Sequence, residues 1–347
     1  MDSESHSFPA VKGIQAQKEY YTAMVSLGNV SQLFKFVDES LSAENRCQRK
    51  INQSRIPQIC NYIVRNREDY IFSSITVSIN GEIEFKPVSD EYKDVGILII
   101  SNNARIIIND GQHRIAAIKE AIKCIPELEN EKISVVFYPD KGLKRSQQMF
   151  SDLNRYSCHP TKSINVLYDS RDLKSRIAKS VVQKVDVFNG LTDTEKSKLS
   201  KRAKALFTLS AISSATEELL SDYIGTESEK ENLAVEYWTK VSEHIPQWTD
   251  VRDGKCKASD IRDHYLCSMS VAMYAIGHGG RSLLKTHPND WIGLISNLDN
   301  VDWSKNNPEW NGIILVEGKI STNRAAQKRI SNYIEAIMTG KIGVDNG

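Results

Sequence analysis

The sequence predicts an α+β protein in which a small mixed sheet with a few helices is followed by a mainly α-helical second half. Two observations carry this prediction. Short alternating or β-branched runs, bounded by turn residues, crowd into the first 140 residues, whereas apolar residues at helical spacing dominate after residue 143. The 347 residues are also enough for two hydrophobic cores. We therefore expect one domain over residues 1–165 and a mainly helical domain, basic in its first part, over residues 166–347.

The composition is that of a globular chain, with 40% hydrophobic residues, 26% charged residues and a net charge of +1. The polar, acidic N-terminus is unlike a signal peptide, and no apolar run is long enough to cross a bilayer. The six cysteines form no C-x-x-C pair and are typical of reduced thiols. We expect a cytoplasmic protein with no membrane partner.

Short strands and helices alternate in the first half. A strand at residues 11–16 is followed by helices at residues 18–27 and 30–36, and an amphipathic helix with Pro57 in its first turn lies within residues 44–65. Further strands are expected at residues 72–79, 82–87, 96–101, 105–108 and 133–138.

Turn residues separate these strands in pairs. Asn80-Gly81 predicts a hairpin between residues 72–79 and 82–87, and Asn102-Asn103 separates the next two strands. After residue 143 the patterns are helical, at residues 145–155, 171–183, 194–209, 211–220, 229–244, 260–276, 288–298 and 323–338.

The chain is organised around residues 105–120, which read R-I-I-I-N-D-G-Q-H-R-I-A-A-I-K-E. A β-branched strand gives way to a turn and then to a helix, so five polar or small residues stand at the start of that helix: Asp110, Gly111, Gln112, His113 and Arg114. Unpaired N–H groups and the positive end of the helix dipole favour an anion at such a turn. A structural interpretation also stays open, in which Asp110 is an N-cap and Gly111 supplies the turn.

Positive charge gathers between residues 141 and 204. This segment holds fifteen Lys and Arg against six Asp and Glu, a net charge of +9 in a nearly neutral chain. Such an asymmetry is expected of a surface that binds a polyanion, although solvated helix faces give the same count.

Several common motifs are absent from the sequence: the P-loop, G-x-G-x-x-G, H-E-x-x-H, zinc-ligand spacing and the G-x-S-x-G nucleophile elbow. Glu317 and Lys319 form half of a metal-nuclease signature after an apolar run, but no aspartate stands at the matching spacing. An ordinary strand end is the favoured interpretation there.

The pentapeptide after the Ile-rich strand resembles the signature of the DGQHR-domain family. Other pieces follow in the order of that family: Gln48-Arg49 with R-I-x-x-I-x-x-Y-I from Arg55, then Q-x-x-F-x-x-x-N from Gln147, then W-x-G-I from Trp310. The resemblance spans nearly the whole chain and looks most like the DndB branch, which belongs to bacterial DNA phosphorothioation.

This resemblance implies a core like that of ParB and sulfiredoxin, whose equivalent turn ends in an arginine and binds the phosphates of a nucleotide. Sulfiredoxin has its reactive cysteine where this chain has Gln112, so sulfiredoxin chemistry is not expected. Relatives with D-G-Q-Q-R belong to nucleotide-hydrolysing parts of DNA-restriction proteins, whereas the fourth residue here is His113.

The resemblance also implies roles for single residues. Arg114 and His113 are expected to contact phosphates, Gly111 to let the backbone approach, Gln112 to position water or the base, and Asp110 to hold Mg²⁺ or orient water. The candidate catalytic residues are thus Asp110, Gln112 and His113. Nucleotide contacts are further expected from Phe150 and Asn154, and DNA contacts from Arg49, Arg55, Lys144, Arg145, Arg155 and Lys162.

The function predicted from the sequence is that of an accessory and regulatory protein of DNA phosphorothioation. It would bind DNA and ATP or another nucleoside triphosphate with Mg²⁺, hydrolyse the nucleotide slowly, and contact other phosphorothioation proteins. The alternative is a non-enzymatic repressor that binds the promoter of its own modification operon. A DNA-nicking enzyme is a third, weaker alternative.

Overall fold

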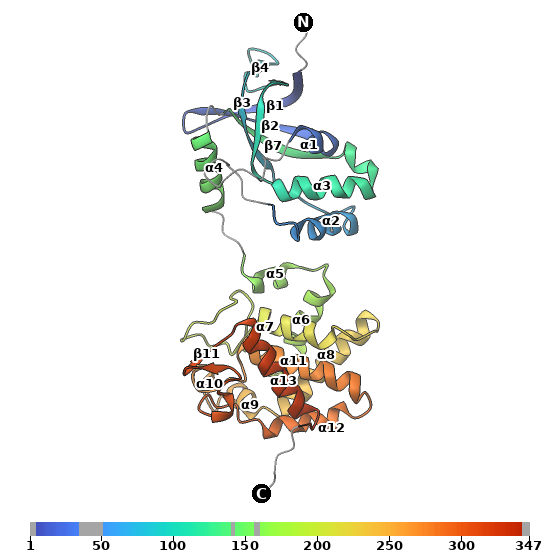
Figure 1. Cartoon of the computed structure of the whole chain (residues 1–347), viewed down its shortest axis with the longest axis vertical. Coiled ribbons are helices and arrows are strands. Elements are labelled where there is room, and N and C mark those ends of the chain that lie inside the picture. Colours follow the sequence, from blue (N-terminus) through green and yellow to red (C-terminus); the bar gives the residue numbers. More distant parts are fainter. Residues whose placement is uncertain (1–4, 35–50, 140–142, 156–159, 342–347) are drawn as a thin grey trace. The chain divides into compact units, whose positions relative to one another are not determined.

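The computed structural model describes residues 5–34, 51–139, 143–155 and 160–341 of the chain (Figure 1). It divides into two compact units, Met1–Cys158 and His159–Gly347. The first is built on a sheet and the second on helices, as the sequence predicts. Each unit is described by itself.

The first unit contains a seven-stranded, mostly antiparallel sheet in the order β4-β5-β1-β2-β7-β3-β6, in which β3 and β7 pair in parallel. Its strands are β1 Ser5–Gln15, β2 Lys18–Ser26, β3 Ile75–Asn80, β4 Ile83–Pro87, β5 Val95–Ser101, β6 Arg105–Asp110 and β7 Lys132–Pro139. Its helices are α1 Leu27–Leu33, α2 Arg55–Arg65, α3 Gln112–Cys124, the 3₁₀ helix η2 Pro126–Asn130 and α4 Leu143–Arg155.

Two of these strand pairs are halves of one long, bent hairpin. β4 continues from β3 and pairs with β5, while β3 pairs with β6, so β3 and β4 together run antiparallel to β5 and β6. The bend is at Gly81, whose φ is +152° and whose added Cβ would lie 2.6 Å from Cα of Ala104. The predicted hairpin turn at Asn80-Gly81 is therefore wrong, because only glycine tolerates this backbone and this approach, and the chain bends there without reversing.

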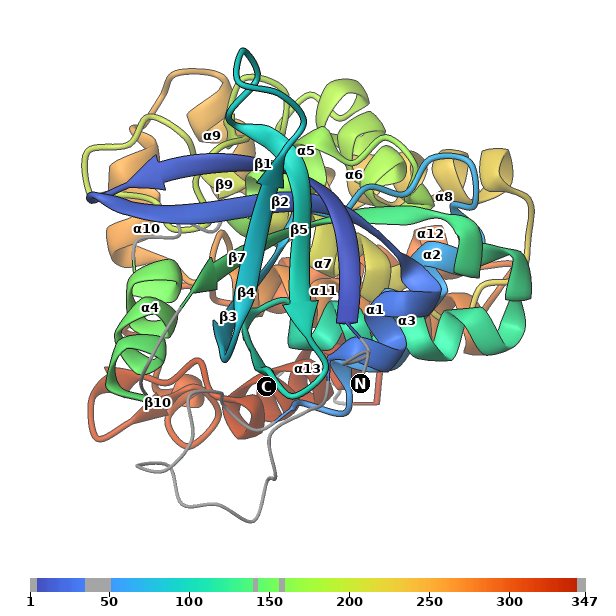
Figure 2. The same cartoon turned by 90° about the horizontal axis from the view of Figure 1, so that it is seen from above.

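β4 and β5 stand at one end of the strand order, and they continue β3 and β6, which stand at the other end. The two ends of the sheet are therefore joined, and the sheet curls on itself. Helices α1 and α3 lie on one side of it and α4 on the other (Figures 1 and 2). Its core is aliphatic, with Val25, Ile75, Val77, Ile118 and Val135 almost completely buried. Burying side chains of this size contributes roughly 1.5–3 kcal/mol each.

Residues 18–26 form β2 where the sequence predicts a helix. Tyr21, Ala23 and Val25 are buried in alternation, and β2 pairs with both β1 and β7. A tight turn at Ala16 and Gln17, both with positive φ, joins β1 to β2. The period of two decides the structure here, since a central strand of a curled sheet buries every second residue.

The second unit is helical, with two short two-stranded sheets and two 3₁₀ helices among its described residues. Its helices are α5 Lys162–Tyr168, α6 Leu173–Lys184, α7 Leu209–Leu220, α8 Glu227–Glu243, α9 Pro246–Arg252, α10 Ala258–His264, α11 Ser270–Thr286, α12 Trp291–Ile295 and α13 Arg324–Met338. The remaining elements are β8 Thr192–Asp193, β9 Phe207–Thr208, η3 Ser296–Asn300, η4 Pro308–Trp310, β10 Leu315–Val316 and β11 Lys319–Ile320.

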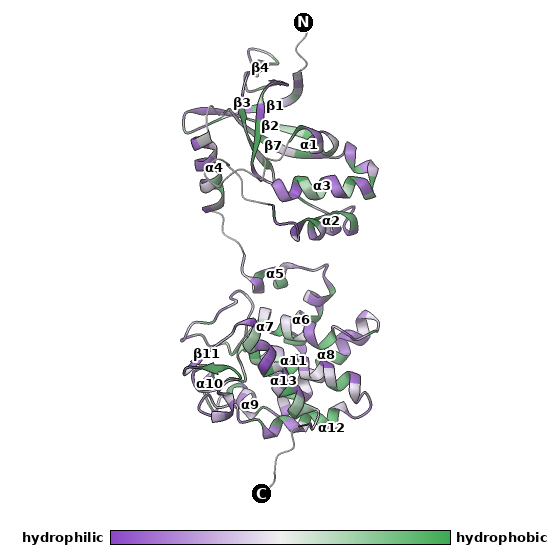
Figure 3. Ribbon diagram, viewed as in Figure 1, coloured by the Kyte–Doolittle hydropathy of each residue, from purple (hydrophilic) through white to green (hydrophobic). Residues whose placement is uncertain are grey.

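The core of this unit is aromatic. Phe188 meets Phe207 edge-on at 4.9 Å between ring centroids, and Trp238 and Trp248 pack against Phe188. In Figure 3 the hydrophobic colour follows the inner faces of the packed helices, while purple marks their outer faces. Within the described residues, no helix is long and apolar enough to cross a membrane.

Residues 194–206 form an irregular loop where the sequence predicts most of a helix. β8 and β9, which pair in parallel, stand just before and after it. Leu199 is the only large apolar residue between Thr194 and Ala205, so a helix here would have no apolar face to bury. This loop becomes important below.

Candidate functional site

The D-G-Q-H-R residues, 110 to 114, form the turn from β6 to α3. Gly111 is the N-cap of α3 and has a left-handed backbone with φ of +103°. A Cβ at Gly111 would lie 3.1 Å from Cγ1 of Ile75 and 3.3 Å from Nη2 of Arg114. The cap has no side-chain hydrogen bond, so Asp110 is not the N-cap, contrary to one interpretation of the sequence. The turn thus stands at the positive end of the α3 dipole, with no side-chain cap from Gly111.

Arg114 points back into the fold. Its Nη1 donates to Oγ of Ser73 at 2.6 Å and to the carbonyl oxygen of Ser74 at 3.0 Å, and also to the carbonyl oxygen of Ser73. Its Nη2 pairs with the carboxylate of Asp110. The Arg114 side chain is only 15% exposed, whereas that of Asp110 is 49% exposed. Arg114 therefore ties the start of β3 to the turn, and the carboxylate is the accessible partner of the pair.

His113 links the turn to the chain before α2. Its Nε2 accepts a hydrogen bond of 2.9 Å from the backbone N–H of Asn52. Asn52 in turn accepts from the backbone and hydroxyl of Ser54, at 3.1 and 2.8 Å. An Nε2 that accepts belongs to a neutral imidazole, so in this arrangement His113 is not a cationic donor to a phosphate.

Two buried amide oxygens beside the turn accept no hydrogen bond from any described atom. They are Oε1 of Gln112, a residue 8% exposed, and Oδ1 of Asn109, 2% exposed. Asn109 is the extra residue of a β-bulge in β6, and its Nδ2 donates to Oγ of Ser78 at 2.5 Å and to Sδ of Met149 at 3.0 Å. An unmet buried acceptor costs about 1–3 kcal/mol, so both oxygens call for a hydrogen-bond donor.

Helix α4 packs against β6 beside these oxygens and brings Met149 to Asn109. Phe150, predicted to contact nucleotide, is half-buried on this helix. Asn154 lies in its last turn, but its side chain is outside the described residues. Phe150 thus lies on the helix that packs against β6, and its contact with nucleotide stays a prediction.

The predicted DNA-contacting residues are spread over three helices. Arg55 is the exposed first residue of α2, Lys144 and Arg155 are exposed on α4, and Arg145 is half-buried there. Arg49 lies outside the described residues. Lys162 is the exposed first residue of α5, in the second unit.

Sequence reasoning missed the partners that hold the turn. Ser73, Ser74 and Asn52 are 40 or more residues from Arg114 and His113, and no local pattern marks them. Asn109 did have a signal, because a polar residue stands at the end of an otherwise apolar strand. Its buried, unpaired oxygen could be found only in the structure.

No group of three or more His, Cys, Asp or Glu side chains suited to a metal gathers within the described part of the chain. A Mg²⁺ ion at Asp110 would therefore take phosphate oxygens and water as its other ligands, as this ion commonly does. Glu317 and Gly318, with φ of +51° and +72°, are the turn between β10 and β11. The half-signature of a nuclease is thus a tight hairpin.

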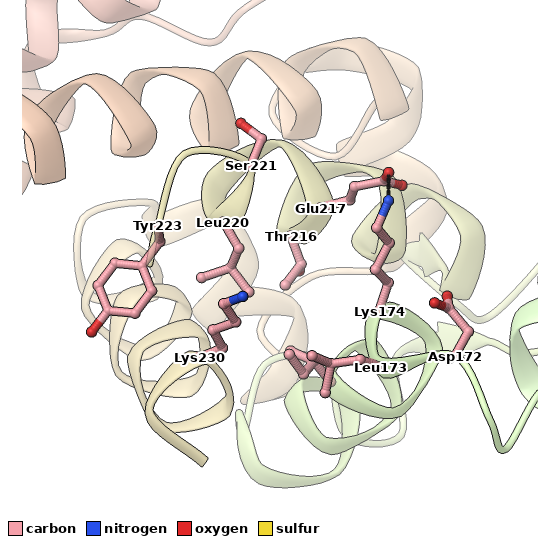
Figure 4. Close-up of a pocket in the computed structure, with 10 residues that line it drawn as sticks. Asp172, Leu173, Lys174, Thr216, Glu217, Leu220, Ser221, Tyr223 and Lys230 are labelled. Carbon is pink, nitrogen blue, oxygen red and sulfur yellow. Dashed lines mark hydrogen bonds and ion pairs between the residues drawn. The ribbon is translucent and has the colours of Figure 1, made fainter. Parts of the chain in front are cut away.

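The second unit has a cavity of about 350 Å³ (Figure 4). Leu173, Ile177 and Leu220 supply apolar lining, and an ion pair between Lys174 and Glu217 lies at one side. No residue that the sequence marks for a site lines it.

Comparison with known proteins gives one match. The model of the DndB family, described as DNA-sulfur modification-associated, matches residues 8–341, nearly the whole chain. None of the curated proteins and none of the solved structures matches significantly.

Proposed function

Since this chain belongs to the DndB family and so has a role in DNA sulfur modification, we propose that it is an accessory and regulatory protein that binds DNA and a nucleoside triphosphate. The D-G-Q-H-R turn is the nucleotide site in this proposal, and hydrolysis there is slow. Other proteins of the modification system are its partners.

The observation that carries the nucleotide site is the pair of unmet oxygens beside an uncapped helix start. The positive end of the α3 dipole favours phosphate, while Oε1 of Gln112 and Oδ1 of Asn109 need donors. A nucleotide supplies both, because it combines an anion with base amino and ribose hydroxyl groups. A simple anion would satisfy only the helix start.

Slow hydrolysis fits the residues around the phosphate position. Asp110 is half-exposed and would be able to hold a Mg²⁺ ion, which would neutralise phosphate charge, at the expense of its pair with Arg114. Arg114 is held by Ser73 and Ser74, so it can support the turn without reaching the phosphates. With Asp110 as its carboxylate and Arg114 engaged inside the fold, the turn is not expected to support rapid phosphoryl transfer.

The test is binding of ATP, GTP and CTP in competition, followed by ATP hydrolysis, with wild type and Gln112→Met. This substitution keeps the volume but removes the oxygen that needs a donor. Nucleotide affinity should fall at least ten-fold, while the protein stays folded. Asp110→Asn should lose hydrolysis and Mg²⁺ dependence and keep nucleotide binding. If wild type binds none of the three nucleotides, the nucleotide site is refuted.

A non-enzymatic repressor is the second candidate, and one observation favours it. Both His113 and Arg114 are engaged inside the fold, which is what a purely structural joint would show. A gel-shift series with and without ATP, across a range of salt, separates the candidates. A DNA affinity that changes when nucleotide is added favours the first candidate. A DNA affinity that weakens with salt but is the same with and without nucleotide at each salt concentration favours the repressor.

A further inference from the structure

The irregular loop at residues 194–206, named the basic loop below, is dense in positive charge. It contains Lys196, Lys198, Lys201, Arg202 and Lys204 against the single acid Glu195. All five cationic residues are exposed, and none forms an ion pair with any residue that the structure describes.

The helices beside the loop differ from it. Lys174 and Arg176 pair with Glu217 and Glu227, and Lys184 pairs with Glu231 at 2.6 Å. Three cations of α6 are thus neutralised by acids from α7 and α8, whereas Lys179, the fourth, donates to the carbonyl oxygens of Leu167 and Asp169. The five cations of the basic loop have no such acid partner among the described residues.

The backbone of the basic loop is held in place at several points. Arg262 of α10 donates to the carbonyl oxygens of Ser200, Lys201 and Ala203 at 3.2, 3.0 and 2.9 Å, and also to that of Ala205. One guanidinium thus donates to four carbonyl oxygens within residues 200–205. A loop shaped in this way presents its side chains from a fixed backbone.

The start of α5 holds the other end of the basic loop. Oγ of Ser163 donates to the carbonyl oxygen of Lys196 at 2.8 Å, and the Ser163 N–H donates to Oγ of Ser197 at 3.1 Å. Thr161 also donates to the carbonyl oxygen of Glu195. Lys162, exposed between Thr161 and Ser163, therefore lies beside the basic loop and adds a sixth cation to its surface.

We infer that the basic loop and Lys162 form the surface that binds the phosphate backbone of duplex DNA. Several unpaired cations on a fixed backbone suit a row of phosphates, because little ordering of the loop is needed on binding. The loop contains no aromatic residue on which an unpaired base could stack, which favours a duplex over a single strand. The choice of DNA as the polyanion rests on the proposed function.

The test compares two triple variants by anisotropy of a labelled DNA duplex over a series of salt concentrations. The loop variant is Lys196→Ala, Lys198→Ala and Lys201→Ala together. The control is Lys285→Ala, Lys319→Ala and Lys328→Ala, three lysines of the same unit that are likewise exposed and, in the described structure, form no ion pair. Both variants lose the same charge.

The loop variant should lower the slope of log affinity against log salt by about 2.7, or about 0.9 per lost phosphate contact, and weaken binding roughly 100-fold or more at 0.1 M salt. The control should keep the wild-type slope. Equal losses in both variants, or a wild-type slope in the loop variant, would overturn the assignment of this surface and leave DNA binding intact. Failure of the wild type to bind duplex would instead refute the DNA-binding part of the proposed function.

Discussion

The D-G-Q-H-R turn leaves hydrogen-bond acceptors without donors, whereas the basic loop leaves cations without acids. In each region one arginine donates to backbone carbonyl oxygens. At the turn, Arg114 and His113 face inward and two buried oxygens are left without donors. At the loop, Arg262 faces inward and the other cations face outward without acids. The turn therefore requires donors as well as an anion, whereas the loop requires only negative charge.

This contrast teaches that an arginine in a basic motif can belong to the scaffold. Arg114 and Arg262 use their planar, multiply donating guanidinium groups to fix a backbone shape. In the proposed function, the groups that meet a ligand are then others, namely the amide oxygens of Asn109 and Gln112 at the turn and the lysines at the loop. Substitutions at the turn, at the loop and at the paired helix cations test this difference.

Arg262→Ala should have the largest effect. It leaves four carbonyl oxygens of the basic loop without their donor, two of them partly buried, which costs about 2–4 kcal/mol of unfolding free energy. The loop should also become open to trypsin, because Lys198 and Lys201 would no longer be held. Urea denaturation and limited trypsin digestion measure the two effects.

Arg176→Ala is the control for that prediction, since Arg176 is an exposed arginine that pairs with Glu227. Its loss should cost less than about 1 kcal/mol and leave the digestion pattern unchanged. If Arg262→Ala behaves like Arg176→Ala, the basic loop is not held by Arg262 and the comparison of the two arginines fails.

Gly111→Ala should have the next largest effect, a loss of about 2–3 kcal/mol. A left-handed alanine costs about 1–2 kcal/mol, and its Cβ would also press on Ile75 at 3.1 Å. Gly190→Ala is the matched control, because Gly190 has φ of +79° but no atom within 4 Å of the added Cβ. The difference between the two variants in urea denaturation isolates the contact with Ile75, and equal losses would show that the turn is not tightly packed.

The sequence alone predicts the strand, turn and helix around Asp110, because β-branched residues, a glycine and spaced isoleucines are all local signals. It also predicts the excess of positive charge, which is a count. The division of that charge could not be predicted, since Lys184 and its partner Glu231 are 47 residues apart. The same distance problem hides the contacts of Arg114 with Ser73 and Ser74.

Two errors in the fold have a common physical origin. Residues 18–27 and 194–209 were both predicted to be helical from composition that is compatible with a helix. Pairing with β1 and β7 overrides that tendency in β2, while Arg262 and Ser163 donate to carbonyl oxygens of the basic loop that helical N–H groups would otherwise satisfy. The sequence does carry a weaker signal for each, in the alternation of Tyr21, Ala23 and Val25 and in the lack of apolar residues around Leu199, but it does not reveal the partners.

Gln112→Met tests the other side of the contrast at a smaller scale. Removing an oxygen that is buried and unmet should raise the free energy of unfolding by roughly 1 kcal/mol in the absence of ligand, while the side-chain volume is kept. The same variant is expected to lose nucleotide affinity, so stability and binding should change in opposite directions. Chemical denaturation without and with nucleotide measures this. A variant less stable than wild type would show that Oε1 is satisfied in solution.

Glu231→Gln should have the smallest effect, and it tests the neutralised helix cations. Hydrogen bonds from Lys184 and Ser180 lower the pKa of Glu231, against the opposing effect of burial. A carboxyl whose pKa is lowered on folding stabilises the protein at every pH above its pKa in the unfolded chain, which is near 4.5. That contribution disappears as the pH falls through the lower pKa of the folded state. Because Glu231 is 36% exposed, we expect the variant to lose only about 0.5 kcal/mol at pH 7 and nothing in strong acid.

Urea denaturation of wild type and Glu231→Gln from pH 7 down to strong acid measures that difference. The variant also releases Lys184 as an unpaired cation on α6. If unpaired charge on any element of this region were enough to bind DNA, the variant should bind duplex more tightly and with a steeper salt slope. Because Lys184 lies on α6, outside the basic loop, we expect the salt slope of the variant to stay at the wild-type value. A steeper slope would show that unpaired charge anywhere in this region is enough for binding.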